Sequence, residues 1–129
     1  PKVCIAQAAV SDLVAADAAA LSDEGDAVRR WVGGPVEDQA APWNALNPTQ
    51  MTPQCPVILA HGEDDVDVPI AMSRACAETY TRRGFGADLM PLPGDHYTII
   101  DASHESWRRI QEVILVWLMS GEGAGHQQT

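Results

Sequence analysis

The stretch VILAHGEDDVDVP, residues 57–69, joins a short apolar run to an acidic loop. Its apolar part predicts a buried strand that ends at His61 and Gly62, because parallel strands covered on both faces are continuously apolar. Pro69 then suits the first turn of a helix. A second stretch, GADLMPLPGDHY over 86–97, has the same order of apolar residues, turn and polar side chains. Together the two stretches decide the fold that we expect.

The rest of the chain alternates predicted strands with predicted helices. We expect strands at 2–10, 57–60 and 86–91, helices at 13–21, 23–31, 69–83 and after Ser103, and an ordered but irregular segment with five prolines at 35–56. Strands that alternate with segments of helical length are typical of a parallel sheet covered by helices. The sequence therefore predicts an α/β fold: a partial doubly wound parallel sheet of about three strands with flanking helices.

Two kinds of side chain able to act as acid and base follow the second and third predicted strands. The carboxylates of Asp64, Asp65 and Asp67 come after the strand at 57–60, and His96 follows the strand at 86–91. Parallel neighbours joined by a crossover helix end at the same edge of the sheet, and neighbouring strands lie about 4.8 Å apart. Ligands bind at that edge in open α/β sheets. We therefore expect a carboxylate and the imidazole to meet there.

The segment HGEDDVDVP resembles the H-G-x-x-D-x-x-V-P segment of α/β-hydrolase-fold esterases and peptidase-like hydrolases, and PGDHY resembles the loop that presents their catalytic histidine. By position in that motif, the resemblance implies that Asp65 is the acid and His96 the general base of a catalytic triad. Asp64 and Asp67 are the alternatives for the acid. The resemblance further implies that residues 1–120 form the C-terminal portion of one hydrolase domain, and we expect residues 121–129 to be a flexible tail.

The function implied by the resemblance is hydrolysis of a carboxylic ester by a Ser–Asp–His triad. A formamidase or other amide hydrolase of the same fold is an alternative, and so is an inactive relative that acts in binding or oligomerisation. The substrate expected is accordingly a small-molecule ester or amide.

The chain departs from the hydrolase pattern at the nucleophile. Such enzymes place the serine in a G-x-S-x-G turn between a strand and a helix, and none of the six serines here stands between glycines in that way. The sequence also begins at Pro1 almost directly before a predicted strand, which suggests a start inside a larger domain. We therefore expect negligible hydrolysis by this chain alone, and either self-association or a complementing N-terminal half.

Composition narrows the classes of partner and location. With 129 residues and a net charge of −10, the chain is one acidic domain at most, which argues against binding nucleic acid or an anionic membrane. Three cysteines without a CxxC pair favour a reducing compartment, and we expect a cytoplasmic protein. No cofactor is expected. A metal site is not expected either, because His61, which we interpret as a turn residue, has no second histidine at ligand spacing.

Overall fold

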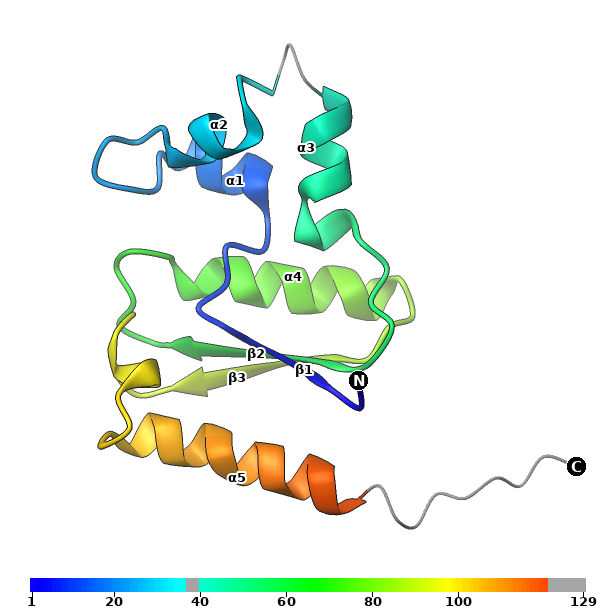
Figure 1. Cartoon of the computed structure of the whole chain (residues 1–129), viewed down its shortest axis with the longest axis vertical. Coiled ribbons are helices and arrows are strands. Elements are labelled where there is room, and N and C mark those ends of the chain that lie inside the picture. Colours follow the sequence, from blue (N-terminus) through cyan, green and yellow to red (C-terminus); the bar gives the residue numbers. More distant parts are fainter. Residues whose placement is uncertain (37–39, 121–129) are drawn as a thin grey trace, which may run out of the picture.

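A computed structural model describes residues 1–36 and 40–120 of the chain. Its centre is a parallel sheet in the order β1-β2-β3 (Figure 1). The three strands are β1 (Cys4–Gln7), β2 (Val57–Gly62) and β3 (Ala87–Leu92). In their register Cys4 lies beside Val57, and Val57 lies beside Ala87. The predicted α/β class is therefore confirmed, and so is the expectation that the second and third strands are parallel neighbours.

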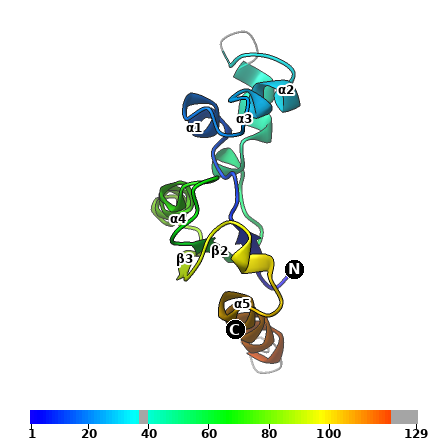
Figure 2. The ribbon, with the colours of Figure 1, turned by 90° about the vertical axis from the view of Figure 1, so that its left-hand side faces the viewer.

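Two helices cover the sheet, one on each face (Figures 1 and 2). They are α4 (Ile70–Arg82) and α5 (Glu105–Met119), and a short 3-10 helix, η2 (Thr98–Ile100), lies before α5. Alternate strand residues serve the two faces, as the pleat requires. Leu59 packs in a core against Tyr80 of α4, whereas Ala60 packs in a second core against Ile110 of α5.

A helical excursion connects β1 to β2 and rises beyond α4 in Figure 1. It contains α1 (Leu13–Ala18), α2 (Ala27–Val32), α3 (Ala40–Leu46) and the 3-10 helix η1 (Pro48–Gln50). Asp12 caps α1, where its carboxylate accepts hydrogen bonds from the backbone N–H groups of Val14 and Ala15. The α2 helix ends at Gly33, whose φ of 102° lies in the left-handed region.

Two sequence-based expectations about this half of the chain are wrong in detail. The first strand covers only four residues, because Ala8 adopts a φ of 44° and turns the chain away from the sheet. The segment 35–56 is not merely irregular, since it contains α3 and η1. Trp43 of α3 is fully buried, and its ring N–H donates to the carbonyl of Gly34, so tertiary packing stabilises a helix in a proline-rich stretch. The predicted tail 121–129 lies outside the described residues.

Candidate active site

The carboxyl ends of β2 and β3 form a rim at which two loops are bonded to each other. The backbone N–H of Glu63 donates to the carbonyl of Leu92 at 2.8 Å, and that of Asp64 donates to the carbonyl of Gly94 at 3.0 Å. A Cβ at Gly62 would lie 2.4 Å from the oxygen of Gly94, so only glycine permits this close approach. The sheet register thus extends into the loops and sets their relative position.

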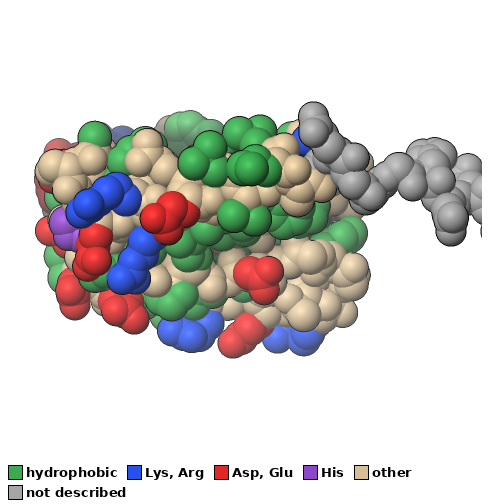
Figure 3. Space-filling model, turned by 90° about the horizontal axis from the view of Figure 1, so that it is seen from below, with side chains coloured by type: hydrophobic (Ala, Val, Ile, Leu, Met, Phe, Trp, Pro, Cys, Tyr) green, Lys and Arg blue, Asp and Glu red, His purple; other side chains and the backbone are tan. Residues whose placement is uncertain are grey.

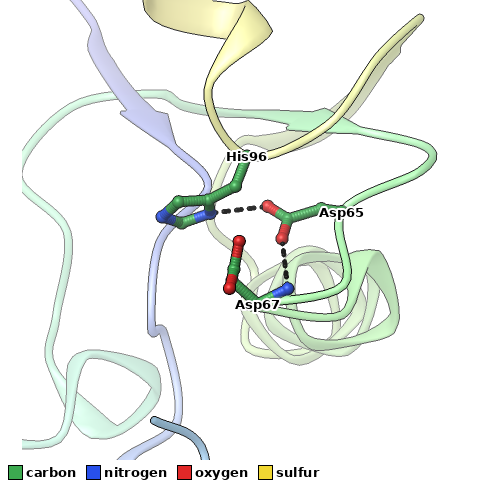
Figure 4. A group of neighbouring side chains, drawn as sticks. All are labelled: Asp65, Asp67 and His96. Atoms are coloured by element: carbon green, nitrogen blue, oxygen red, sulfur yellow. Dashed lines mark hydrogen bonds and ion pairs between the residues drawn. The ribbon is translucent and has the colours of Figure 1, made fainter. Parts of the chain in front are cut away.

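Asp65 and His96 meet across this rim (Figure 4). Oδ2 of Asp65 lies 2.8 Å from Nδ1 of His96. The other oxygen, Oδ1, accepts from the backbone N–H groups of Val68 at 2.8 Å and Asp67 at 3.0 Å. The Asp65 side chain is fully buried, and its carboxylate is held by the backbone of its own loop on one side and by the imidazole of His96 on the other.

The surroundings of Asp65 favour its ionised form. Burial by itself would raise the pKa of the carboxyl, but the N–H of Val68, the ring of His96 and the N–H of Asp67 stabilise the negative charge and leave the pKa below its ordinary value. A carboxylate can only accept hydrogen bonds, so Nδ1 of His96 carries the proton of the bond between them. In the neutral ring Nε2 then keeps a lone pair that can take up a proton.

The loop after β3 presents His96 with part of its ring open to solvent. The side chain is 32% exposed, and the ring of Tyr97 stands edge-on to it, with 5.5 Å between the ring centroids. Asp95 stabilises the loop, because its Oδ1 accepts from the backbone N–H groups of Tyr97 and Thr98. The imidazole is therefore anchored through Nδ1 and accessible to another reactant.

The structure separates the three aspartates that the sequence left open. Asp64 and Asp67 are both exposed, and only Asp65 is buried. Asp67 nonetheless comes close, because one ligand atom each from Asp65, Asp67 and His96 lie within 4.8 Å of one another. Sequence spacing did not indicate this cluster, although Asp65 and His96 already bond each other within it. The expectation that the site needs no metal or cofactor stays a prediction.

His61 is the residue that sequence reasoning placed wrongly. We interpreted it as a turn residue, whereas it is fully buried inside β2. Its Nδ1 lies 2.7 Å from Oγ of Ser73 on α4, and its Nε2 lies 2.7 Å from the carbonyl of Val68 and 3.3 Å from Oδ2 of Asp65. The strand alternation held the missed signal, since position 61 shares the α4-facing side with Val57 and Leu59.

The serines do not complete a triad here. Ser73 bonds His61, Ser11 donates to the carbonyl of Met72, and Ser106 donates to the carbonyl of Pro93. Across residues 1–36 and 40–120, no serine is hydrogen-bonded to His96. Within the same part of the chain, no helix is long and apolar enough to cross a membrane.

Several solved structures of peptidases and esterases share this arrangement. Pyrococcus horikoshii acylaminoacyl peptidase matches 99% of this chain, with a TM-score of 0.69 and 17% sequence identity. Thermogutta terrifontis esterase 2 matches 98% of the chain, with a TM-score of 0.65 and 21% identity. A puromycin-hydrolyzing peptidase of Mycobacterium tuberculosis also matches 98% of the chain, with a TM-score of 0.66 and 15% identity. No family model matches the chain, and no curated protein matches it in sequence.

The matched region is only part of each of these proteins. The chain spans 22% of the P. horikoshii peptidase, 44% of the esterase and 19% of the mycobacterial peptidase. Its three parallel strands with flanking helices correspond to the C-terminal part of their hydrolase architecture. The chain therefore has the α/β-hydrolase fold and forms a C-terminal part of it.

Proposed function

We propose that this chain contributes the acid and the general base of a serine hydrolase, with Asp65 and His96 in those roles. The observation that carries the proposal is the 2.8 Å contact between Asp65 Oδ2 and His96 Nδ1 at the carboxyl edge of two parallel strands. Asp65 would fix the Nδ1–H tautomer and stabilise the imidazolium. Nε2 of His96 would take the proton of a serine hydroxyl and then pass it to the leaving group.

We propose a carboxylic ester as the substrate class, with an amide as the alternative. Both chemistries need the same proton transfers at His96, because the nucleophile attacks a carbonyl carbon and the leaving oxygen or nitrogen must be protonated. The structural neighbours include an esterase and peptidases, so they support an acyl-transfer site without separating the two substrates.

The nucleophile would come from polypeptide outside these 129 residues, docked beside β1. β1 is an edge strand, and an apolar groove opens on each face next to it. One groove of about 340 Å³ is lined by Cys4, Ala6 and Tyr80 among others, and the other, of about 470 Å³, by Ile5, Ile114 and Trp117 among others. A further parallel strand with a helix on each face would pair the edge and cover both grooves. We therefore favour a complementing strand–helix segment of the same domain.

Reconstitution tests this proposal. The chain is mixed or co-expressed with a hydrolase segment that carries a glycine-flanked serine, and turnover of nitrophenyl esters and of matched anilides is measured. We expect turnover only from the mixture, with a fluorophosphonate probe labelling the added segment. Labelling of the 129-residue chain itself would contradict the assignment, and so would a folded mixture that shows no turnover. Turnover by the chain alone, at any concentration, would likewise contradict it, because a second copy brings no glycine-flanked serine.

We also propose a cytoplasmic location. Cys4, Cys55 and Cys76 are all free thiols, which suits a reducing compartment. Fractionation of the native host tests this, and recovery of the protein in a secreted or membrane fraction would contradict it.

A further inference from the structure

We infer that His61, held by Ser73, is a positioning residue for the acid of the dyad. The inference rests on the proposed function, because it concerns how Asp65 is presented to His96. It starts from a series of buried hydrogen bonds that the proposed triad does not use. They run from Oγ of Ser73 to Nδ1 of His61, and from Nε2 of His61 to the acid loop. His61 and Ser73 are both fully buried, so each polar atom in this series needs a partner.

The partners determine which ring nitrogen of His61 carries a proton. The carbonyl of Val68, 2.7 Å from Nε2, can only accept, so Nε2 carries a hydrogen. Asp65 Oδ2, 3.3 Å from the same nitrogen, can only accept as well. In the neutral ring Nδ1 then accepts from the hydroxyl of Ser73 at 2.7 Å. Nε2–H of His61 is thus aimed at the acid loop and at the oxygen that also receives the proton of His96.

Val68 is the peptide unit through which the positioning acts. Its N–H donates to Oδ1 of Asp65, and its carbonyl accepts from His61, so both polar atoms of one residue are engaged. The carboxylate of Asp65 closes the loop from Asp65 to Val68. The imidazole of His61 connects the same loop to strand β2 and, through Ser73, to helix α4. Without the His61 donor, the Val68 carbonyl would lose its buried partner and the carboxylate would be free to shift.

Two substitutions at position 61 separate the donor from mere packing. His61→Gln places an amide N–H near the position of Nε2, whereas His61→Asn places its amide near Nδ1 and leaves the Val68 carbonyl without a donor. The readout is the ratio of the two neutral tautomers of His96, measured by ¹⁵N NMR on the 129-residue chain at alkaline pH. That ratio reports how well Asp65 holds Nδ1–H, and it needs no turnover.

We expect the wild-type protein and His61→Gln to keep the Nδ1–H tautomer of His96. His61→Asn should shift the tautomer ratio by about tenfold toward Nε2–H, the effect of weakening one hydrogen bond. A folded His61→Asn variant with an unchanged ratio would overturn the inference. An equal loss in His61→Gln and His61→Asn would also overturn it, because the donor would then not be the cause.

If His61→Asn does not fold, the tautomer ratio of His96 in Ser73→Ala still tests the inference. It removes only the hydroxyl that holds Nδ1 of His61, so it should shift the His96 tautomer ratio in the same direction by a smaller factor. Ser11→Ala is the matched control, since Ser11 is also buried and its hydroxyl donates to the carbonyl of Met72 in the same turn of α4, not to His61. A Ser73→Ala ratio equal to that of Ser11→Ala would overturn the inference.

In the reconstituted hydrolase the same pair extends the test to catalysis. His61→Asn should lower kcat and leave KM near the wild-type value, whereas His61→Gln should retain both. A reconstituted mixture without any turnover would contradict the proposed function while leaving the tautomer result intact, so the two failures are distinguishable.

Discussion

The rim formed by β2 and β3 differs sharply from the edge formed by β1 and the second half of α5. At the rim His61 and Asp65 are buried, and their side chains contact each other and polar groups of the two loops and of α4. Along α5, only Ser106 and Ile110 are buried, and both lie in its first half. The polar side chains of the rim are buried and hydrogen-bonded, whereas the apolar side chains along the edge are exposed.

The exposed part of this edge is unusually apolar. Figure 3 shows hydrophobic side chains gathered on the face that carries α5. Large apolar residues there with a third or more of their surface exposed are Ile114, Leu115, Val116, Leu118 and Met119. Contiguous apolar surface of this kind marks a place where other protein packs. The contact between Asp65 and His96 therefore forms within the described residues, whereas the apolar surface beside β1 and α5 is not covered by any of them.

The largest effect should come from breaking the dyad at the rim. In a reconstituted hydrolase, Asp65→Asn and His96→Ala should each lower kcat by about 10³-fold or more, because the imidazole would lose its orientation or its base. Asp67→Asn is the matched control, since the carboxylate of Asp67 belongs to the same loop but is exposed and does not bond Nδ1 of His96. A harmless Asp65→Asn together with a damaging Asp67→Asn would show that the acid has been assigned to the wrong residue.

The next effect compares the two halves of α5. Ile110 is 1% exposed and Leu118 is 58% exposed. Ile110→Ala should lower the free energy of unfolding by about 2–5 kcal/mol, since it leaves a cavity against β2, whereas Leu118→Ala should change it by less than about 0.5 kcal/mol. Urea denaturation of the two variants measures both values. Equal destabilisation would mean that the second half of α5 is packed in solution.

A third test addresses the partner that the edge lacks. In the chain alone we expect concentration-dependent self-association, and Leu118→Lys should raise its dissociation constant by about tenfold or more, because a charge would replace apolar contact. Val66→Lys is the control, because Val66 is 88% exposed but lies on the acid loop. Sedimentation velocity over a range of concentrations gives the constants. If both variants associate like the wild-type chain, the surface on α5 is not where copies meet.

The smallest effect should be on how the free energy of unfolding changes with pH. The pKa of Asp65 is below its unfolded value, so its carboxylate stabilises the fold above the unfolded pKa of about 3.9 and this stabilisation is lost as pH falls through the folded value. Asp65→Asn should therefore make the free energy of unfolding fall less steeply between about pH 6 and pH 3 than in the wild type.

A second carboxylate provides the comparison for that slope. Hydrogen bonds from Ser103 lower the pKa of Asp101, but Asp101 is exposed, so solvent screens its charge. Asp101→Asn should consequently flatten the pH dependence less than Asp65→Asn. A larger effect from Asp101→Asn would indicate that the buried dyad is not the main acid-sensitive contact.

Much of the rim follows from local sequence. The apolar run before His61, the glycine at 62 and the Pro-Gly turn before Asp95 and His96 are short-range features, and they located both loops and placed the two strand ends to within about two residues. Because the carboxyl ends of neighbouring parallel strands lie at one edge of the sheet, the contact between Asp65 and His96 could be predicted without knowing how the helices pack.

Other features depended on contacts that a local pattern does not contain. The helix α3 forms in a proline-rich stretch because Trp43 is buried, and β1 is short because Ala8 adopts a left-handed conformation. Both outcomes depend on where the helical excursion packs against the rest of the chain, and neither is set by the spacing of apolar residues.

Local sequence was enough to predict the fold class, the second and third strands as parallel neighbours, and the two loops that meet at their ends. The packed structure was needed to show that Asp65 is the buried carboxylate, that Asp67 lies close to it, and that His61 joins Ser73 to the acid loop. Strand and turn signals act over a few residues, whereas the burial of a polar side chain depends on which helix packs over it.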